Sequence, residues 1–255
     1  MFARDGSYPA WPDHRSPASE QTHASVTQIQ PVLGGQLKEA HVNVLAQACV
    51  LSPSMPLQVV QEWHQSGVEI DDIYLIGITQ TAQLMGEWWC EDLLDFATAT
   101  IAFYRLHQLL YALSPVFYET ATPQAQGLSC CIVGEFGGQH TLGMFMLSEF
   151  FRREGWRVRS PDCEDGRDLL RTVASDWFDV ITLSISSDRQ LGLFRRLIPM
   201  IRKQSANPAI RILAGGPMLA LRPQGMHKLG ADALSTDARQ AQKTAIKGLL
   251  TPSKM

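Results

Sequence analysis

The sequence predicts an α/β protein in which a helical bundle, residues 33–118, precedes a doubly wound, five-stranded parallel sheet, residues 128–250. Two observations predict this division. Up to about residue 117, apolar residues recur at i, i+3, i+4 and i+7, which is the period of an amphipathic helix. After a polar, proline-containing linker at residues 119–127, short apolar runs alternate with helical segments. That alternation is typical of a parallel sheet covered by helices on both faces.

The first part consists of helical segments at residues 34–52, 56–67, 71–92 and 92–117. Pro53 and Gly67 are expected to end the first two segments. The acidic residues of "EIDD" and "CEDLLD" come where later helices begin, and a helix N-terminus favours negative charge. Four or five antiparallel helices within about eighty residues predict a small bundle.

In the second part, each apolar run predicts a buried strand and each segment after it a helix. The strands are expected at residues 128–134, 156–160, 178–186, 209–216 and 231–235, and the helices at residues 140–154, 165–176, 188–204, 218–230 and 237–250. Ligands of such sheets lie at the carboxyl ends of the strands. Functional residues are therefore expected in the loops that follow the strands.

The composition excludes several classes of protein. Of the 255 residues, 45% are hydrophobic, which is enough for a substantial core. No apolar run approaches the length of a membrane span, and the first residues lack the apolar core of a secretory signal. Residues 1–32, rich in Pro, Ser and Ala, are expected to form a disordered arm, and residues 251–255 a tail. The five cysteines show no CxxC spacing, which predicts reduced thiols in the cytoplasm.

The net charge of −3 is unevenly distributed along the chain. Residues 35–115 contain nine acidic and two basic side chains, whereas residues 127–255 contain eighteen Lys and Arg against twelve Asp and Glu. Two parts of opposite charge can bind different partners, and an acidic face attracts basic proteins. Two solvated surfaces without a partner would give the same pattern.

Candidate binding residues follow three of the expected strands. They are His140 and Gly143 after the first strand, Ser184 and Ser186 at the end of the third, and Gly215 and Gly216 at the end of the fourth. A lone histidine at a helix start is more often a cap, and a glycine pair is more often a turn. Their joint occurrence at three strand ends favours a deep, narrow ligand slot. The absence of GxGxxG and GxxxxGK[ST] argues against a dinucleotide or ATP.

This combination of HxxG, SxS and GG resembles the cobalamin-binding domains, which have a Rossmann-like or flavodoxin-like sheet. The resemblance covers about residues 35 to 250. It implies that His140 is the lower axial ligand of cobalt and the metal-binding residue. It also implies a slot for the displaced dimethylbenzimidazole tail, lined by Gly143, Ser184, Gly215 and Gly216. Ser186 and the residues that flank the histidine, Gln139, Thr141 and Leu142, are further candidate cofactor-binding residues.

The helical part resembles the four-helix cap that covers the upper face of the corrin in this family. Residues 84–110 are similar to the cap of light-sensing regulators of the CarH kind, and Trp88 or Trp89 matches the tryptophan that packs over the corrin. Ala99 and Thr100 stand where those regulators have a Glu-His pair, which implies a more open upper face. The usual Asp of DxHxxG is replaced by Gly138.

These departures, with "QHTLG" and the two tryptophans of the cap, resemble the AerR/PpaA antirepressors of purple photosynthetic bacteria and the related sensor domain of AppA-type regulators. The resemblance implies a light-responsive regulator, not an enzyme, that binds hydroxo- or adenosylcobalamin. It would relieve repression by a DNA-binding repressor of the CrtJ/PpsR kind, with neither sequence-specific DNA binding of its own nor a membrane partner. Heme at the same histidine, a corrinoid methyl carrier and a scaffold without a ligand stay as alternatives.

Overall fold

The computed structural model describes residue 32 and residues 35–121, 123, 125, 127–136 and 142–250. The expected arm at residues 1–32, apart from Val32, and the expected tail at residues 251–255 lie outside the described residues. Val32 is buried in the core of the helical unit. Within the described residues, no helix is long and apolar enough to span a membrane.

The helical unit is formed by α1 (Glu39–Leu51), α2 (Met55–Gln65), α3 (Ile70–Asp72), η3 (Ile73–Ile78), α4 (Thr79–Cys90) and α5 (Phe96–Glu119). The segments α3, η3 and α4 follow one another without a gap, so residues 70–90 form one helix with a π-helical stretch. Gly77 lies in that stretch, and a Cβ atom there would be 2.9 Å from the ring of Trp63. The close approach of Trp63 therefore requires glycine at this position.

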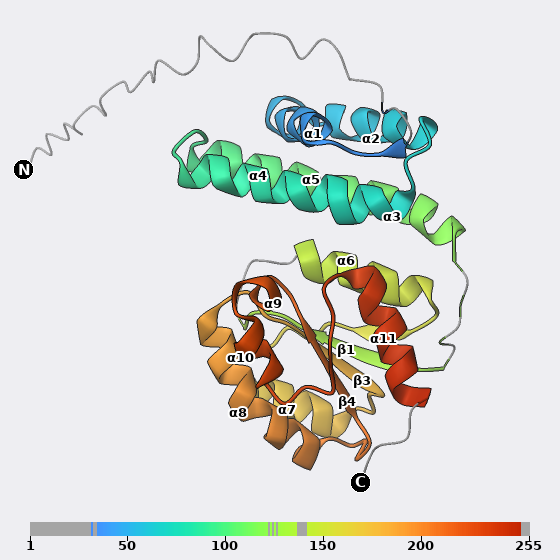
Figure 1. Cartoon of the computed structure of the whole chain (residues 1–255), viewed down its shortest axis with the longest axis vertical. Coiled ribbons are helices and arrows are strands. Elements are labelled where there is room, and N and C mark those ends of the chain that lie inside the picture. Colours follow the sequence, from blue (N-terminus) through green and yellow to red (C-terminus); the bar gives the residue numbers. More distant parts are fainter. Residues whose placement is uncertain are drawn as a thin grey trace, which may run out of the picture.

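The second unit contains a parallel sheet with the strand order β2-β1-β3-β4-β5, as predicted for a doubly wound α/β fold. Its strands are β1 (Ser129–Val133), β2 (Arg157–Arg159), β3 (Val180–Ser184), β4 (Arg211–Gly215) and β5 (Ala233–Leu234). The face toward the helical unit is covered by α6 (Leu142–Arg153) and α11 (Ala238–Leu250), and the opposite face by α7 (Gly166–Ser175), α8 (Asp188–Gln204) and α10 (Pro223–His227) (Figure 1).

One expected helix is divided in two. Residues 218–230 were expected to be one short helix, but α9 (Met218–Leu221) ends before α10 begins at Pro223. Arg222 separates them with φ −138° and ψ 59°. A proline disfavours helical geometry in the residue before it, which explains the break.

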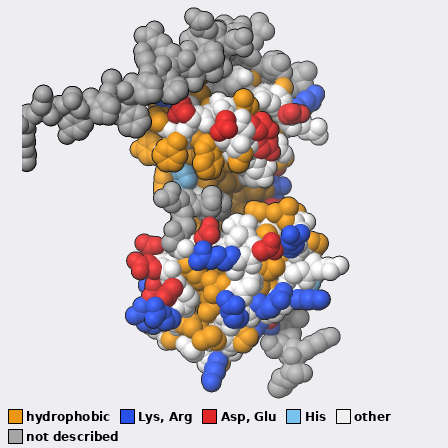
Figure 2. Space-filling model, turned by 90° about the vertical axis from the view of Figure 1, so that its left-hand side faces the viewer, with side chains coloured by type: hydrophobic (Ala, Val, Ile, Leu, Met, Phe, Trp, Pro, Cys, Tyr) orange, Lys and Arg blue, Asp and Glu red, His pale blue; other side chains and the backbone are white. Residues whose placement is uncertain are grey.

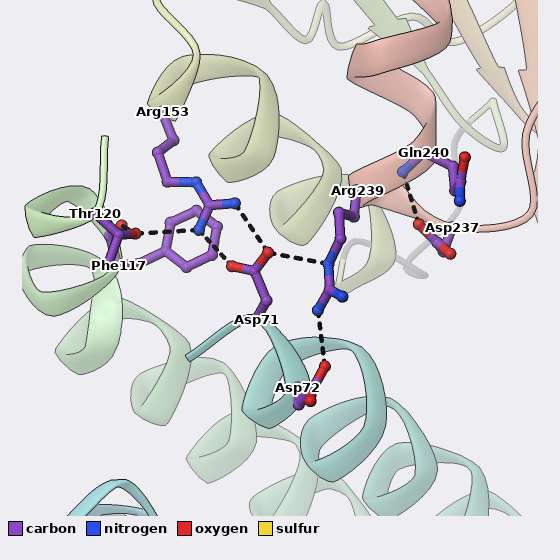
Figure 3. A network of polar contacts seen from close by, with 8 residues as sticks. All are labelled: Asp71, Asp72, Phe117, Thr120, Arg153, Asp237, Arg239 and Gln240. Atoms are coloured by element: carbon purple, nitrogen blue, oxygen red, sulfur yellow. Dashed lines mark hydrogen bonds and ion pairs between the residues drawn. The ribbon is translucent and has the colours of Figure 1, made fainter. Parts of the chain in front are cut away.

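The two units are joined by a polar cluster beside an aromatic contact (Figure 3). Arg153, in the last turn of α6, is buried and forms an ion pair with Asp71 of α3. Its guanidinium lies over the ring of Phe117, 4.0 Å from the centroid. Arg239 of α11 pairs with Asp71 at 3.0 Å and with Asp72 at 2.7 Å. Both helices of the layer below the helical unit, α6 and α11, are thus tied to the same helix start.

Candidate functional site

The candidate site is built on the carboxyl ends of β1, β3 and β4, which point to the same side of the molecule (Figure 1). Ser184 ends β3 and is the register partner of Gly215 at the end of β4. Val180 and Leu213 of the same strands pack with α11, and strand side chains alternate between faces. Ser184 and Gly215 therefore face α6 and α11. Among the described residues, the half-buried Ser184 hydroxyl has no hydrogen-bond partner.

Gly215 and Gly216 bring neighbouring strand ends close together. A Cβ atom at Gly215 would lie 2.7 Å from the carbonyl oxygen of Ser235. Gly216 has φ +97°, and a Cβ atom there would lie 2.6 Å from the carbonyl oxygen of Ile185. The amide of Ile185 donates to the Gly215 carbonyl at 2.9 Å, and the amide of Met218 donates to the Ile185 carbonyl at 3.1 Å. The edge of the slot at β4 is therefore bare backbone.

Gly143 differs from these glycines because nothing in the described part of the chain requires it. It is exposed in the first turn of α6, and no described atom lies within 4 Å of a Cβ atom placed there. In contrast, a Cβ atom at Gly134 would lie 2.1 Å from the sulfur of Met144. Among the described residues, Gly143 thus leaves open space beside α6, at the same edge of the sheet as Ser184 and Gly215. An open position of this kind fits a bulky ligand that approaches the backbone.

The predicted axial ligand, His140, lies outside the described residues together with Gln139 and Thr141. Leu142, the first residue of α6, is half-buried and packs against the core of the helical unit. Ser186 is exposed, and its hydroxyl donates to the side-chain oxygen of Gln190 at 2.8 Å. The Ser186 hydroxyl is therefore already hydrogen-bonded to the first turn of α8, unlike the hydroxyl of Ser184.

The helical unit extends beyond α6, over the carboxyl edge of the sheet (Figure 1). Tyr111 of α5 contacts Phe145 of α6, with ring centroids 4.6 Å apart. One and two turns further along α5, Ser114 and Tyr118 donate to the carboxylate of Glu149, which lies one turn further along α6. The two helices therefore run side by side in the same direction. The part of α5 before Tyr111 lies beyond the start of α6.

The overhanging surface is largely apolar. Figure 2 shows hydrophobic side chains gathered on the edge of the helical unit that faces the α/β unit. Of the predicted tryptophans, Trp88 packs against the bundle core, whereas Trp89 is 50% exposed. Phe96 and Tyr104 on α5 are 75% and 63% exposed. The sequence predicts a tryptophan here, and the structure places it at the overhanging end of the unit.

Two residues of this surface were not among the candidates. His107 and Tyr104 lie one and two turns before Tyr111 and share its helix face, because spacings of three and four residues return to the same side. Burial lowers the pKa of His107 below its ordinary value, which favours the neutral imidazole. The repeated three- and four-residue spacing from Tyr104 to Tyr118 was the available signal. This spacing identifies the helix face of α5 that borders the site only when α6 is known to pack along that face.

The comparisons with known proteins agree with this geometry. Residues 130–244 match the family model described as the B12 binding domain. A 20.5 kDa protein from the bchF-crtJ intergenic region of Rhodobacter capsulatus is 27% identical over 176 residues, which cover 69% of this chain and 91% of that protein. The monomethylamine corrinoid protein of Methanosarcina barkeri has the same fold, with a TM-score of 0.66, 13% identity, and coverage of 82% of this chain and 96% of that protein.

The described residues fit a cobalamin. Gly143 carries no side chain beside the unpartnered Ser184 hydroxyl, which can donate a hydrogen bond to a ligand at this edge, and the apolar overhang can cover a large flat ring. The family match supports cobalamin as the ligand and gives no support to heme. Residues 130–244 of this chain thus match the B12 binding domain in sequence, and they form a five-stranded parallel sheet with the candidate residues Ser184 and Gly215 at its carboxyl edge.

Proposed function

We propose that this protein is a cobalamin-binding, light-responsive regulator that acts on a DNA-binding repressor of the CrtJ/PpsR kind. The observation that carries the proposal is the carboxyl edge of a sheet that matches the B12 binding domain, with Gly143 and Ser184 at this edge and an apolar helical overhang above it. A ligand held there would contact both units at once. Loss or rearrangement of the ligand would therefore change how the helical unit and the α/β unit pack against each other.

Each part of the site has a distinct role in this proposal. His140 would bind the metal, and Ser184 would donate a hydrogen bond to the ligand. Gly143 would leave room for the ligand, and Trp89 would cover it. Gly215 and Gly216 let the backbone at Ser235 and Ile185 approach the end of β4 closely. When bound, cobalamin supplies a light-absorbing cobalt centre. The chain's own residues hold the ligand, exclude water from it and sense its shape.

Two further observations support a regulatory role. The gene of the Rhodobacter relative lies between bchF and crtJ, near photosynthesis genes. The helical unit is acidic, with nine Asp and Glu against two basic residues over positions 35–115, and suits a basic, DNA-binding partner. Because the chain combines a match to the B12 binding domain with an acidic unit suited to a basic partner, we propose a regulator and not an enzyme.

The regulatory proposal is tested with a gel-retardation assay that contains the repressor and its promoter DNA. The cobalamin-loaded protein should change the amount of retarded DNA, and the change should differ between light and dark. The Gly143→Leu variant, which fills the open space, should behave like the cobalamin-free protein. Identical retardation in light and dark, with and without the loaded protein, would exclude the antirepressor role.

A corrinoid methyl carrier is the second candidate, because the Methanosarcina corrinoid protein shares the fold over most of both chains. A carrier would pass a methyl group from the loaded protein to an acceptor thiol in the presence of a partner methyltransferase. Stoichiometric transfer in this assay, together with an unchanged retardation pattern, would favour the carrier over the regulator. Titration with hemin in place of cobalamin tests the remaining alternative ligand.

A further inference from the structure

Helix α8 carries a basic ridge, which we define as Arg189, Arg196 and Lys203. The three residues are spaced by seven positions, so they lie on one side of the helix about 10.5 Å apart. All three are exposed, whereas the opposite side of α8 is buried in the core. Gly192 and Pro199 lie between them with short side chains. The ridge is therefore a nearly straight row of positive charges.

The charges of the ridge are not neutralised within the molecule. No ion pair or hydrogen bond joins Arg189, Arg196 or Lys203 to another residue in the part of the chain that the structure describes. The neighbouring helix α7 shows the opposite arrangement. There Arg167 pairs with Asp165 at 2.7 Å, and Arg171 pairs with Asp168. A row of unpaired cations is the surface that a polyanion fits.

The ridge lies far from the acidic helical unit. Helix α8 covers the sheet face opposite to α6 and α11, and the helical unit lies beyond those two helices (Figure 1). Three layer spacings of about 10 Å separate them, whereas charges in physiological salt are screened over about 8 Å. Figure 2 shows Lys and Arg side chains gathered over the α/β unit. An anion at α8 would thus not be repelled by the acidic unit.

We propose that the basic ridge of α8 binds the phosphate backbone of duplex DNA without reading its sequence. Such a contact goes beyond the proposed function, because it holds the regulator beside a DNA-bound repressor through a surface that does not touch the ligand site. A regular row of exposed Arg and Lys is the electrostatic pattern of phosphate binding, and Asp188, which precedes the row, is paired with Arg222. It requires neither a recognition helix nor contacts to base edges.

The expected strength follows from counterion release. Three phosphate contacts give a slope of about −2.7 in a plot of log K against log salt, which is an affinity loss of about 40-fold between about 50 and about 200 mM salt. Removal of two of the three contacts should reduce the slope by about two. Non-specific affinities of this kind lie at about 10⁻⁴ to 10⁻⁶ M.

The test is fluorescence anisotropy of a labelled DNA duplex of arbitrary sequence, titrated with the full chain across that salt range. The variant Arg189→Gln/Arg196→Gln should bind more weakly and lose most of the salt dependence. The matched control, Arg167→Gln/Arg171→Gln, changes the net charge equally but removes arginines that already have acidic partners. It should keep the wild-type slope.

Equal losses in both variants, or no binding by the wild type at the lowest salt, would overturn the proposal. A second copy of the chain could instead dock its acidic unit on the ridge. Sedimentation equilibrium without DNA detects such self-association. The proposal would also be overturned if the wild type self-associates and does not bind DNA, and if only the ridge variant abolishes the self-association. The cobalamin-free protein is used throughout, so a failure here leaves the ligand site untouched.

Discussion

The junction between the two units should depend on Asp71 more than on Arg153, although the two form one ion pair. Asp71→Asn leaves the Arg153 guanidinium, whose side chain is only 8% exposed, with the Thr120 hydroxyl at 3.3 Å and the Phe117 ring as partners. An uncompensated buried charge costs about 3–5 kcal/mol. Arg153→Met leaves Asp71 paired with Arg239 at 3.0 Å. The loss is then about 1.5–3 kcal/mol, the range for a hydrogen bond to a charged group.

The assay is urea unfolding at neutral pH, followed by tryptophan fluorescence. The double variant should be less destabilised than the sum of the single variants, with a coupling free energy of about 2–3 kcal/mol. Arg171→Gln serves as the control, because its side chain is 79% exposed and its ion pair should contribute less than about 1 kcal/mol. A coupling below about 0.5 kcal/mol, or a larger loss for Arg153→Met than for Asp71→Asn, would refute this account of the junction.

Three further predictions concern single residues. Gly216→Ala should lower the free energy of unfolding by at least about 2 kcal/mol in urea titrations, because of its φ of +97° and the Ile185 carbonyl; a loss below 1 kcal/mol would contradict this. Ellman's reagent at pH 8 should rapidly label only one thiol of the native protein, that of the exposed Cys90. Burial raises the pKa of Cys49 and of Cys130 to about 12, which keeps these thiols protonated. Rapid labelling of several thiols would contradict this. Burial lowers the pKa of His107, so the unfolded chain binds a proton that the folded chain does not as pH falls below about 6.5. Unfolding titrations between pH 7 and pH 5 should therefore show a smaller loss of stability in His107→Gln than in the wild type, and parallel curves would contradict it.

The three central strands β1, β3 and β4 could be predicted because a strand buried on both faces is a short, nearly continuous apolar run. "SCCIV" and "VITLS" are such runs, and they lie side by side in the sheet. The break at Arg222 was not predicted, although Pro223 is visible in the sequence, because the apolar residues on either side continue the helical pattern. The π-helical stretch at Ile73–Ile78 could not be predicted, since it accompanies the tertiary approach of Trp63 to Gly77.

The candidate site was partly predictable for a topological reason. Ser184 and Gly215 end strands that are neighbours in the sheet, so their positions in the sequence place them together. The reason for Gly216 could not be predicted, because the Ile185 carbonyl approaches it from another strand end. Tyr104 and His107 were missed because the direction in which α5 faces depends on its packing against α6.

The most direct test of the account is a titration of the purified protein with hydroxocobalamin, followed by its absorption spectrum. The wild type should bind cobalamin with a spectrum that differs from that of free cobalamin. The control variant Gly192→Leu should behave in the same way, because Gly192 is an exposed helical glycine with open space like Gly143 but lies on α8. Gly143→Leu should lose binding, and His140→Ala should lose the shifted spectrum. Wild-type binding and spectra in both Gly143→Leu and His140→Ala would contradict a cobalamin site at the carboxyl ends of the strands.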